Sequence, residues 1–303
     1  GRGIVTIRMG PEMPDSTRAS FTKYTLPYVF ERYPEIHSNF LVNFWKEMTT
    51  WIIVIFVAVL LIAAEEICAR NEWVRAHEII EKLRIIFKWN YLLILIGTSL
   101  ADIVLFSSLQ FRTFNAHTSF AALSLEMTIA MISLGVILLL GSYYVVRKIY
   151  LVKNSGTQSR QEISEGIIEW RSFQVFYRAF TENMMTNRQF YLIYAIRLCL
   201  PMFIASYLYV SPMTQTILYM IISTVTIGYI WLAKPIKRKL NYYQLMILEW
   251  FMLVINICLF LLVVLSREER RTSSYGIALG DIIIFCNAGI HVLLMVVLIV
   301  KFC

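Results

Sequence analysis

The chain has 303 residues, of which 58% are hydrophobic and 16% charged, and its formal net charge is +8. A soluble domain of this length needs a larger polar fraction to cover its surface, so the composition excludes an ordinary soluble protein. The apolar residues come in blocks of about twenty, the length that crosses a bilayer as a helix, which predicts an all-α polytopic membrane protein.

Residues 1–48 contain no spanning run and include Pro11, Pro14 and Pro27, so we expect an extracellular, juxtamembrane lead-in with irregular backbone. Aromatic and charged residues are mixed over 30–48, which fits either a helix along the membrane interface or an ordinary lead-in to the first crossing. The chain begins Gly-Arg-Gly and shows no signal-peptide pattern, so we expect it to be part of a longer protein.

Residues 49–303 are predicted to form a domain of seven transmembrane helices. The first apolar run, 51–64, has only fourteen residues, so it spans only if it recruits the turn before Trp51 or if the bilayer thins locally. The other six predicted crossings are 89–111, 120–146, 190–210, 214–233, 242–265 and 275–300.

The connecting loops differ sharply in basic residues. The loops after the first, third and fifth crossings hold 16 Lys and Arg, whereas the loops after the second, fourth and sixth hold 4. The positive-inside rule therefore places the N-terminus outside and the C-terminus inside. Within the cytoplasmic loop 154–188, Ile163, Ile167 and Trp170 recur on one stripe, which predicts an amphipathic helix on the inner leaflet or on a partner.

Two charges of opposite sign fall at matching depth inside predicted crossings. Arg197 and Glu249 each lie eight residues from the cytoplasmic side, about 12 Å into the membrane. An isolated charge at this depth is costly, so we predict an intramembrane ion pair between them. His291 comes to a similar or slightly shallower level.

Three carboxylates, those of Asp102, Glu126 and Asp281, reach similar levels in the outer half of the membrane, with no basic residue at that level. One hypothesis is a cation or proton site that all three line. The alternative is three separate groups, each bonded to hydroxyls and water or kept protonated by apolar surroundings.

Other features bound the function. Gly276 and Gly280 form a GxxxG that permits close approach of another helix.

The five cysteines have no CxxC spacing or His partner, so we expect free thiols, no metal site and no cofactor. Basic residues sit at helix ends and not in a soluble basic-aromatic segment, which argues against nucleic-acid binding. The familiar phosphate-loop, hydrolase and metalloprotease motifs are absent, so we do not expect an enzyme.

A family resemblance covers about two-thirds of the chain. The resemblance rests on the following segments: the lead-in 39–47 (NFLVNFWKE), Phe176-Tyr177, Pro212-Met-Thr-Gln, the segment 229–235 (YIWLAKP) with Asn241 and Glu249, and the start of the final helix, 275–280 (YGIALG). This pattern resembles the C-terminal membrane domain of very large ciliate surface proteins, which are distantly similar to TRP-like and polycystin-like membrane proteins. The resemblance implies a plasma or ciliary membrane and a large extracellular region upstream.

Three functions remain open on the sequence. The first is a membrane anchor that assembles a large extracellular region with lipid and with other membrane or extracellular chains, a homo-oligomer included. The second is a TRP-like cation channel or channel subunit. The short loop 266–274 counts against this function, because it leaves no room for a pore helix. The third, a seven-helix receptor, has topology alone in its favour.

Overall fold

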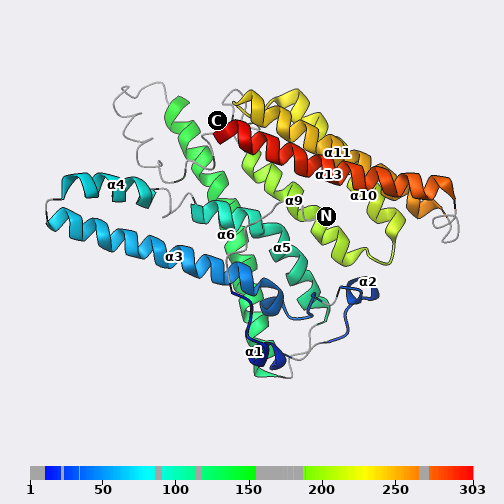
Figure 1. Cartoon of the computed structure of the whole chain (residues 1–303), viewed down its shortest axis with the longest axis horizontal. Coiled ribbons are helices and arrows are strands. Elements are labelled where there is room, and N and C mark those ends of the chain that lie inside the picture. The colour runs from blue at the N-terminus through cyan, green and yellow to red at the C-terminus, as the bar shows by residue number, and fades with distance from the viewer. Residues whose placement is uncertain are drawn as a thin grey trace. The chain divides into compact units, whose positions relative to one another are not determined.

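The computed structural model describes residues 11–21, 24–33, 35–71, 73–85, 91–113, 118–154, 189–265 and 273–302, together with Phe173, Phe176, Phe180 and Asn187. Within these residues there is no strand, and the β contact found is an isolated antiparallel bridge between Phe180 and Ile236. Short helices α1 (Asp15–Ala19) and α2 (Tyr28–Glu31) lie in the lead-in (Figure 1).

Seven helices in the described part of the chain are long and apolar enough to cross a bilayer. The prediction of an all-α polytopic membrane protein is therefore confirmed. The seven are α3 (Phe40–Arg70), α5 (Leu92–Arg112), α6 (Ser119–Asn154), α9 (Phe190–Tyr207), α10 (Pro212–Ala233), α11 (Lys239–Val264) and α13 (Ser274–Phe302).

The first crossing is longer than its apolar run. Helix α3 has 31 residues, so it includes the turn before Trp51 as well as Glu65 and Glu66. No glycine or proline occurs between Phe40 and Arg70, so nothing in the backbone interrupts the helix. From Phe40 onward the segment 30–48 is helical and continuous with α3, and its place along the membrane interface or in an ordinary lead-in stays a prediction.

The loop expected over 65–88 contains a further helix. Helix α4 (Val74–Ile85) packs back against α3 (Figure 1), and Arg84 Nε lies 2.7 Å from Glu65 Oε2. Helix α6 likewise continues past its predicted end at Val146 to Asn154. The amphipathic helix predicted within 154–188 lies almost wholly outside the described residues.

Packing divides the chain into two compact units, each described here by itself. The N-terminal unit comprises Thr6–Arg178 with Tyr191–Met202, and the C-terminal unit comprises Gly1–Val5, Ala179–Phe190 and Phe203–Cys303. In the N-terminal unit α5 packs on both α3 and α6, and half of its apolar window is buried (50%) against 17% for α3. Helix α5 is therefore the centre of that unit.

The C-terminal unit is built around α11, which packs on α10 and on α13. Figure 1 shows α11 and α13 running side by side. Ile255 of α11 and Cys286 and Ile290 of α13 form its apolar core, with Phe251 and Leu294 packed against them.

Candidate functional site

The first turn of α3 is capped by side chains from two other helices. The Phe40 N–H donates to Gln110 Oε1 (2.8 Å), and the Leu41 N–H donates to Ser124 Oγ (3.2 Å). Ser124 Oγ in turn donates to Gln110 Oε1 (3.0 Å). The residue before the helix, Asn39, makes no side-chain cap of its own. Gln110 and Ser124 therefore satisfy backbone donors that the helix itself leaves open. We call this arrangement the α3 cap.

The lead-in is fastened to the same place. Ser38 Oγ accepts the backbone N–H of Tyr24 (2.9 Å), and the carbonyl of Ser38 accepts from Thr113 Oγ1 (3.3 Å). The ring of Phe21 packs edge-on against Phe120 at the start of α6, with 5.2 Å between centroids. Ser38, Gln110 and Ser124 are buried. The start of α3, the end of α5 and the start of α6 thus meet at one end of the N-terminal unit.

His37 and Asn43 stabilise the same turn. His37 Nδ1 accepts the Asn39 backbone N–H (3.1 Å), so a neutral His37 carries its proton on Nε2. The His37 N–H donates to Asn43 Oδ1 (2.8 Å), and Asn43 Nδ2 donates back to the His37 carbonyl (2.6 Å). The polar groups of this end are therefore used to fix backbone.

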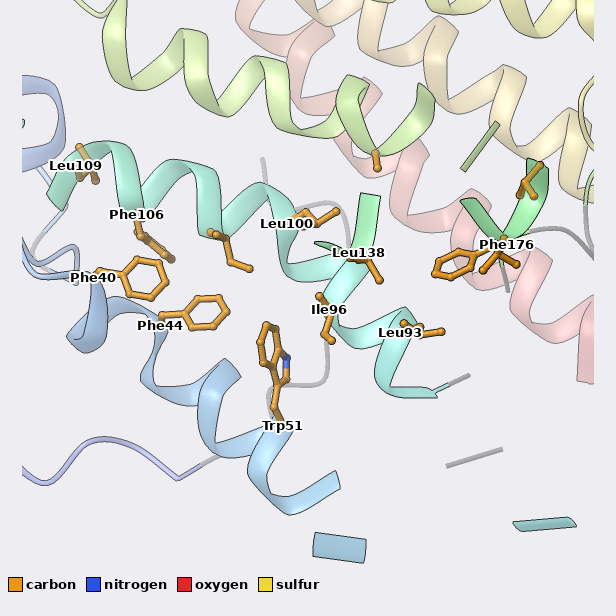
Figure 2. Close-up of a cluster of buried hydrophobic side chains, with 14 of the residues drawn as sticks. Phe40, Phe44, Trp51, Leu93, Ile96, Leu100, Phe106, Leu109, Leu138 and Phe176 are labelled. Atoms are coloured by element: carbon orange, nitrogen blue, oxygen red, sulfur yellow. The ribbon is translucent and has the colours of Figure 1, made fainter. Parts of the chain in front are cut away.

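An aromatic cluster continues from the cap along the α3–α5 contact (Figure 2). Phe40 and Phe44 stack at 5.0 Å between centroids, and Phe44 meets Trp51 edge-on at 5.3 Å. Figure 2 shows these rings facing Phe106 and Ile96 of α5. Large buried rings of this kind contribute both apolar area and fixed geometry, so they set how α3 lies on α5.

Helix α9 joins the N-terminal unit through Tyr191. Its ring meets Phe176 edge-on at 4.9 Å, and its hydroxyl lies over Gly97 of α5. The hydroxyl is buried and has no hydrogen-bond partner. A side chain at position 97 would overlap that hydroxyl, so it would have to displace the Tyr191 ring or shift α5.

In the C-terminal unit a polar contact joins α10 to α11. Asn256 Nδ2 donates to Ser223 Oγ (3.0 Å) and lies 3.4 Å from the Tyr219 carbonyl oxygen. Asn256 and Ser223 are both buried. Hydrogen bonds of this kind fix the contact between transmembrane helices where apolar packing alone is unspecific.

The three predicted outer carboxylates have different surroundings. Asp102 in α5 is half-buried, Glu126 in α6 is exposed, and Asp281 in α13 is exposed. Asp102 and Glu126 belong to the N-terminal unit and Asp281 to the C-terminal unit. Among the described residues, no three His, Cys, Asp or Glu side chains gather in a way that could hold a metal ion. A shared site of Asp102, Glu126 and Asp281 stays a prediction.

The two residues of the predicted ion pair belong to different units. Arg197 lies in the part of α9 that belongs to the N-terminal unit, and Glu249 lies in α11, buried to 2% exposure. The pair therefore stays a prediction. His291 is exposed on α13.

Helix α13 approaches α11 closely at Gly289. A β-carbon at Gly280 would meet nothing within 4 Å, whereas one at Gly289 would lie 3.2 Å from Phe251 Cζ of α11. Gly276 is buried, and its N–H donates to Ser273 Oγ (3.0 Å). Gly289 is thus a close approach between α11 and α13 in the described residues, and the role of the Gly276–Gly280 motif stays a prediction.

The four described cysteines, Cys68, Cys199, Cys258 and Cys286, are free thiols, as the sequence predicts. Sequence reasoning missed Gln110 and Ser124, because single polar residues near helix ends are common. One signal was available. The first turn of the helix that starts at Phe40 contains no acidic residue, so its free backbone N–H groups need hydrogen-bond acceptors from elsewhere in the chain.

No protein-family model, no curated protein and no solved structure matches this chain. The resemblance to ciliate surface proteins and TRP-like membrane domains therefore stays a hypothesis.

Proposed function

We propose that the chain is a non-catalytic seven-helix module that anchors a large extracellular region in the membrane and assembles it with other chains. The observation that carries this proposal is the attachment of the lead-in. Phe21 packs on the start of α6, and Ser38, which also holds the backbone of Tyr24, accepts a hydrogen bond from the end of α5. The α3 cap then fixes the first crossing. A chain entering from a large upstream region would transmit load to three helices, not to one.

The way the polar side chains are used supports the same proposal. The buried hydrogen-bonding groups described above, those of Gln110, Ser124 and Asn256, join one helix to another. A pore needs polar groups that face a water-filled path. The resemblance to ciliate surface proteins points to the plasma or ciliary membrane. The assemblies that the proposal covers include a homo-oligomer.

The test is a reporter domain fused before residue 1 of the 303-residue chain. With the N-terminus outside, the reporter is labelled on intact cells and stays with the membrane after alkaline extraction. Replacing Ser38 and Gln110 by Ala should increase release of the reporter by mild detergent, because the lead-in loses its attachment. Replacing Ser133, an exposed serine of α6, should not. A reporter that only permeabilised cells expose would contradict the orientation and the proposal together.

One observation favours the second function, a TRP-like cation channel or subunit. Glu126 and Asp281 are exposed on helices whose surroundings are otherwise apolar. An ionisable group at this depth faces protein or water and not lipid, as a channel-lining group would. Purified protein in liposomes should then pass monovalent cations, and Asp102→Asn, Glu126→Gln and Asp281→Asn together should abolish the flux. Unchanged flux in the triple variant removes the ion site.

A further inference from the structure

The turn between α10 and α11 concentrates positive charge. Residues 234–239 hold four cations in six positions, and all four side chains are exposed: Lys234, Lys237, Arg238 and Lys239. No aspartate or glutamate occurs between residues 183 and 248. The first turn of α11 likewise contains no acidic residue. The turn and its flanking sequence therefore carry a net positive charge. We call residues 234–239 the basic turn.

The basic turn has a fixed backbone. Lys234 adopts a left-handed conformation (φ 44°), and its N–H donates to the Ile230 carbonyl (3.0 Å). Pro235 is buried, and Ile236 forms the antiparallel bridge with Phe180. Asn187 Nδ2 donates to the Ala233 carbonyl (2.7 Å), which caps the end of α10. The cations are therefore carried on a held loop and not on a free tail.

The same end of the C-terminal unit holds amide groups with unused hydrogen-bonding capacity. Gln189 is buried, and neither its Nε2 nor its Oε1 has a partner. The basic turn also joins two spanning helices directly, which places it at the level of lipid headgroups. An anion at this level is most often a lipid phosphate, and basic residues beside transmembrane helices attract such lipids.

We propose that the basic turn binds the phosphate groups of anionic lipids, with a preference for headgroups that carry several phosphates. A fixed loop with four cations can place two or more of them on one headgroup, whereas a singly charged headgroup engages fewer. The inference is independent of the anchoring function, because it needs only a turn at the membrane surface.

The experiment uses the 303-residue chain in phosphatidylcholine nanodiscs and a fluorescent short-chain phosphatidylinositol bisphosphate as the probe. Lys237→Gln with Arg238→Gln should raise the Kd about fivefold per cation removed, and so about 25-fold together. The control, Arg147→Gln with Lys148→Gln, removes two exposed cations at the end of α6 and should change the Kd less than twofold. The charge-preserving pair Lys237→Arg with Arg238→Lys should keep binding, which separates lost charge from lost folding.

Any one of the following outcomes would overturn the proposal. Equal weakening by the α6 control would mean that net charge and not the basic turn binds the lipid. Equal affinity for phosphatidylserine would remove the preference for several phosphates. Equally tight and equally sensitive binding of soluble inositol trisphosphate would mean that the turn takes a free phosphate compound and not a lipid. If the Gln variants fail to fold, Lys239→Gln alone should still weaken binding about fivefold, and an unchanged Kd there would contradict the inference.

Discussion

The hydroxyl of Tyr191 in α9 lies directly over Gly97 in α5, where it occupies the space that any β-carbon would need. The next ring atom, Cζ, would stand 3.4 Å from such a carbon, which is ordinary contact. The conflict at position 97 is therefore due to one oxygen atom. The ring cannot move aside freely, since it also packs edge-on against Phe176.

Gly97→Ala should lower the free energy of unfolding by about 1–3 kcal/mol, the usual cost of overpacking. Tyr191→Phe removes the oxygen that has no hydrogen-bond partner, so it should be close to neutral alone and should restore most of the loss in the double variant. Thermal unfolding in detergent of the four proteins gives the coupling. Gly141→Ala, whose β-carbon meets nothing within 4 Å, is the control and should be neutral or slightly stabilising. Additive effects of Gly97→Ala and Tyr191→Phe would contradict the contact.

Removing the α3 cap should destabilise the N-terminal unit. Ser124→Ala takes away the acceptor of the Leu41 N–H, which is buried, and a buried donor without a partner costs about 1–3 kcal/mol. Ser133→Ala is matched, since Ser133 is also on α6 but is exposed and binds only its own helix at Ile129, and it should stay within about 0.5 kcal/mol. Thermal unfolding compares the two variants. If they lose equal stability, the cap does not hold α3.

The sequence predicts the crossings well because hydropathy and proline determine them together. The sixth crossing was expected over 242–265 and is observed as Lys239–Val264, and the fifth begins at Pro212, a residue suited to the first helical position. Hydropathy fails at the polar ends. Glu65, Glu66 and Lys46 continue α3 because they are good helix formers, although they do not belong in lipid. Helix ends therefore extend beyond the apolar runs that reveal them.

The contacts between helices were not predictable in the same way. The Gln110–Ser124 contact of the α3 cap and the Asn256–Ser223 contact each join residues of two helices, and a single sequence gives no information on which helices are neighbours. Charge depth suggested partners for Arg197 and Glu249 from level alone. The depth of a residue in the membrane does not determine which way its side chain points around the helix axis. Depth alone therefore cannot decide whether two side chains meet.

Asn256→Leu should weaken the α10–α11 contact. The variant loses the hydrogen bond from Asn256 Nδ2 to Ser223 Oγ, and interhelical bonds in membranes contribute about 0.6 kcal/mol on average and up to about 1.7. Asn287→Leu in α13 is the control, because Asn287 Nδ2 binds the Ile283 carbonyl of its own helix. Unfolding in a graded detergent mixture measures both. A larger loss in Asn287→Leu would show that the α10–α11 bond is unimportant.

The contact of the lead-in with α3 should depend on pH. Glu12 Oε1 lies 2.6 Å from Lys46 Nζ, and the hydrogen bond and positive charge of Lys46 hold the pKa of Glu12 below its usual 4.5. A carboxyl whose pKa is lower in the folded state than in the unfolded state stabilises the fold fully above about pH 4.5, and this contribution is lost as the pH falls through the folded-state pKa. Because both side chains are accessible to water, the effect is small.

Glu12→Gln should therefore melt at a slightly lower temperature than the wild type at pH 7, and the difference should shrink as the pH falls below 4.5. Glu35→Gln, a change at another carboxylate of the lead-in that is exposed, is the control for charge alone. High salt should reduce the Glu12 effect at pH 7, since accessible ion pairs are screened. A melting difference that persists unchanged at pH 3 would mean that Glu12 acts through packing and not through its charge.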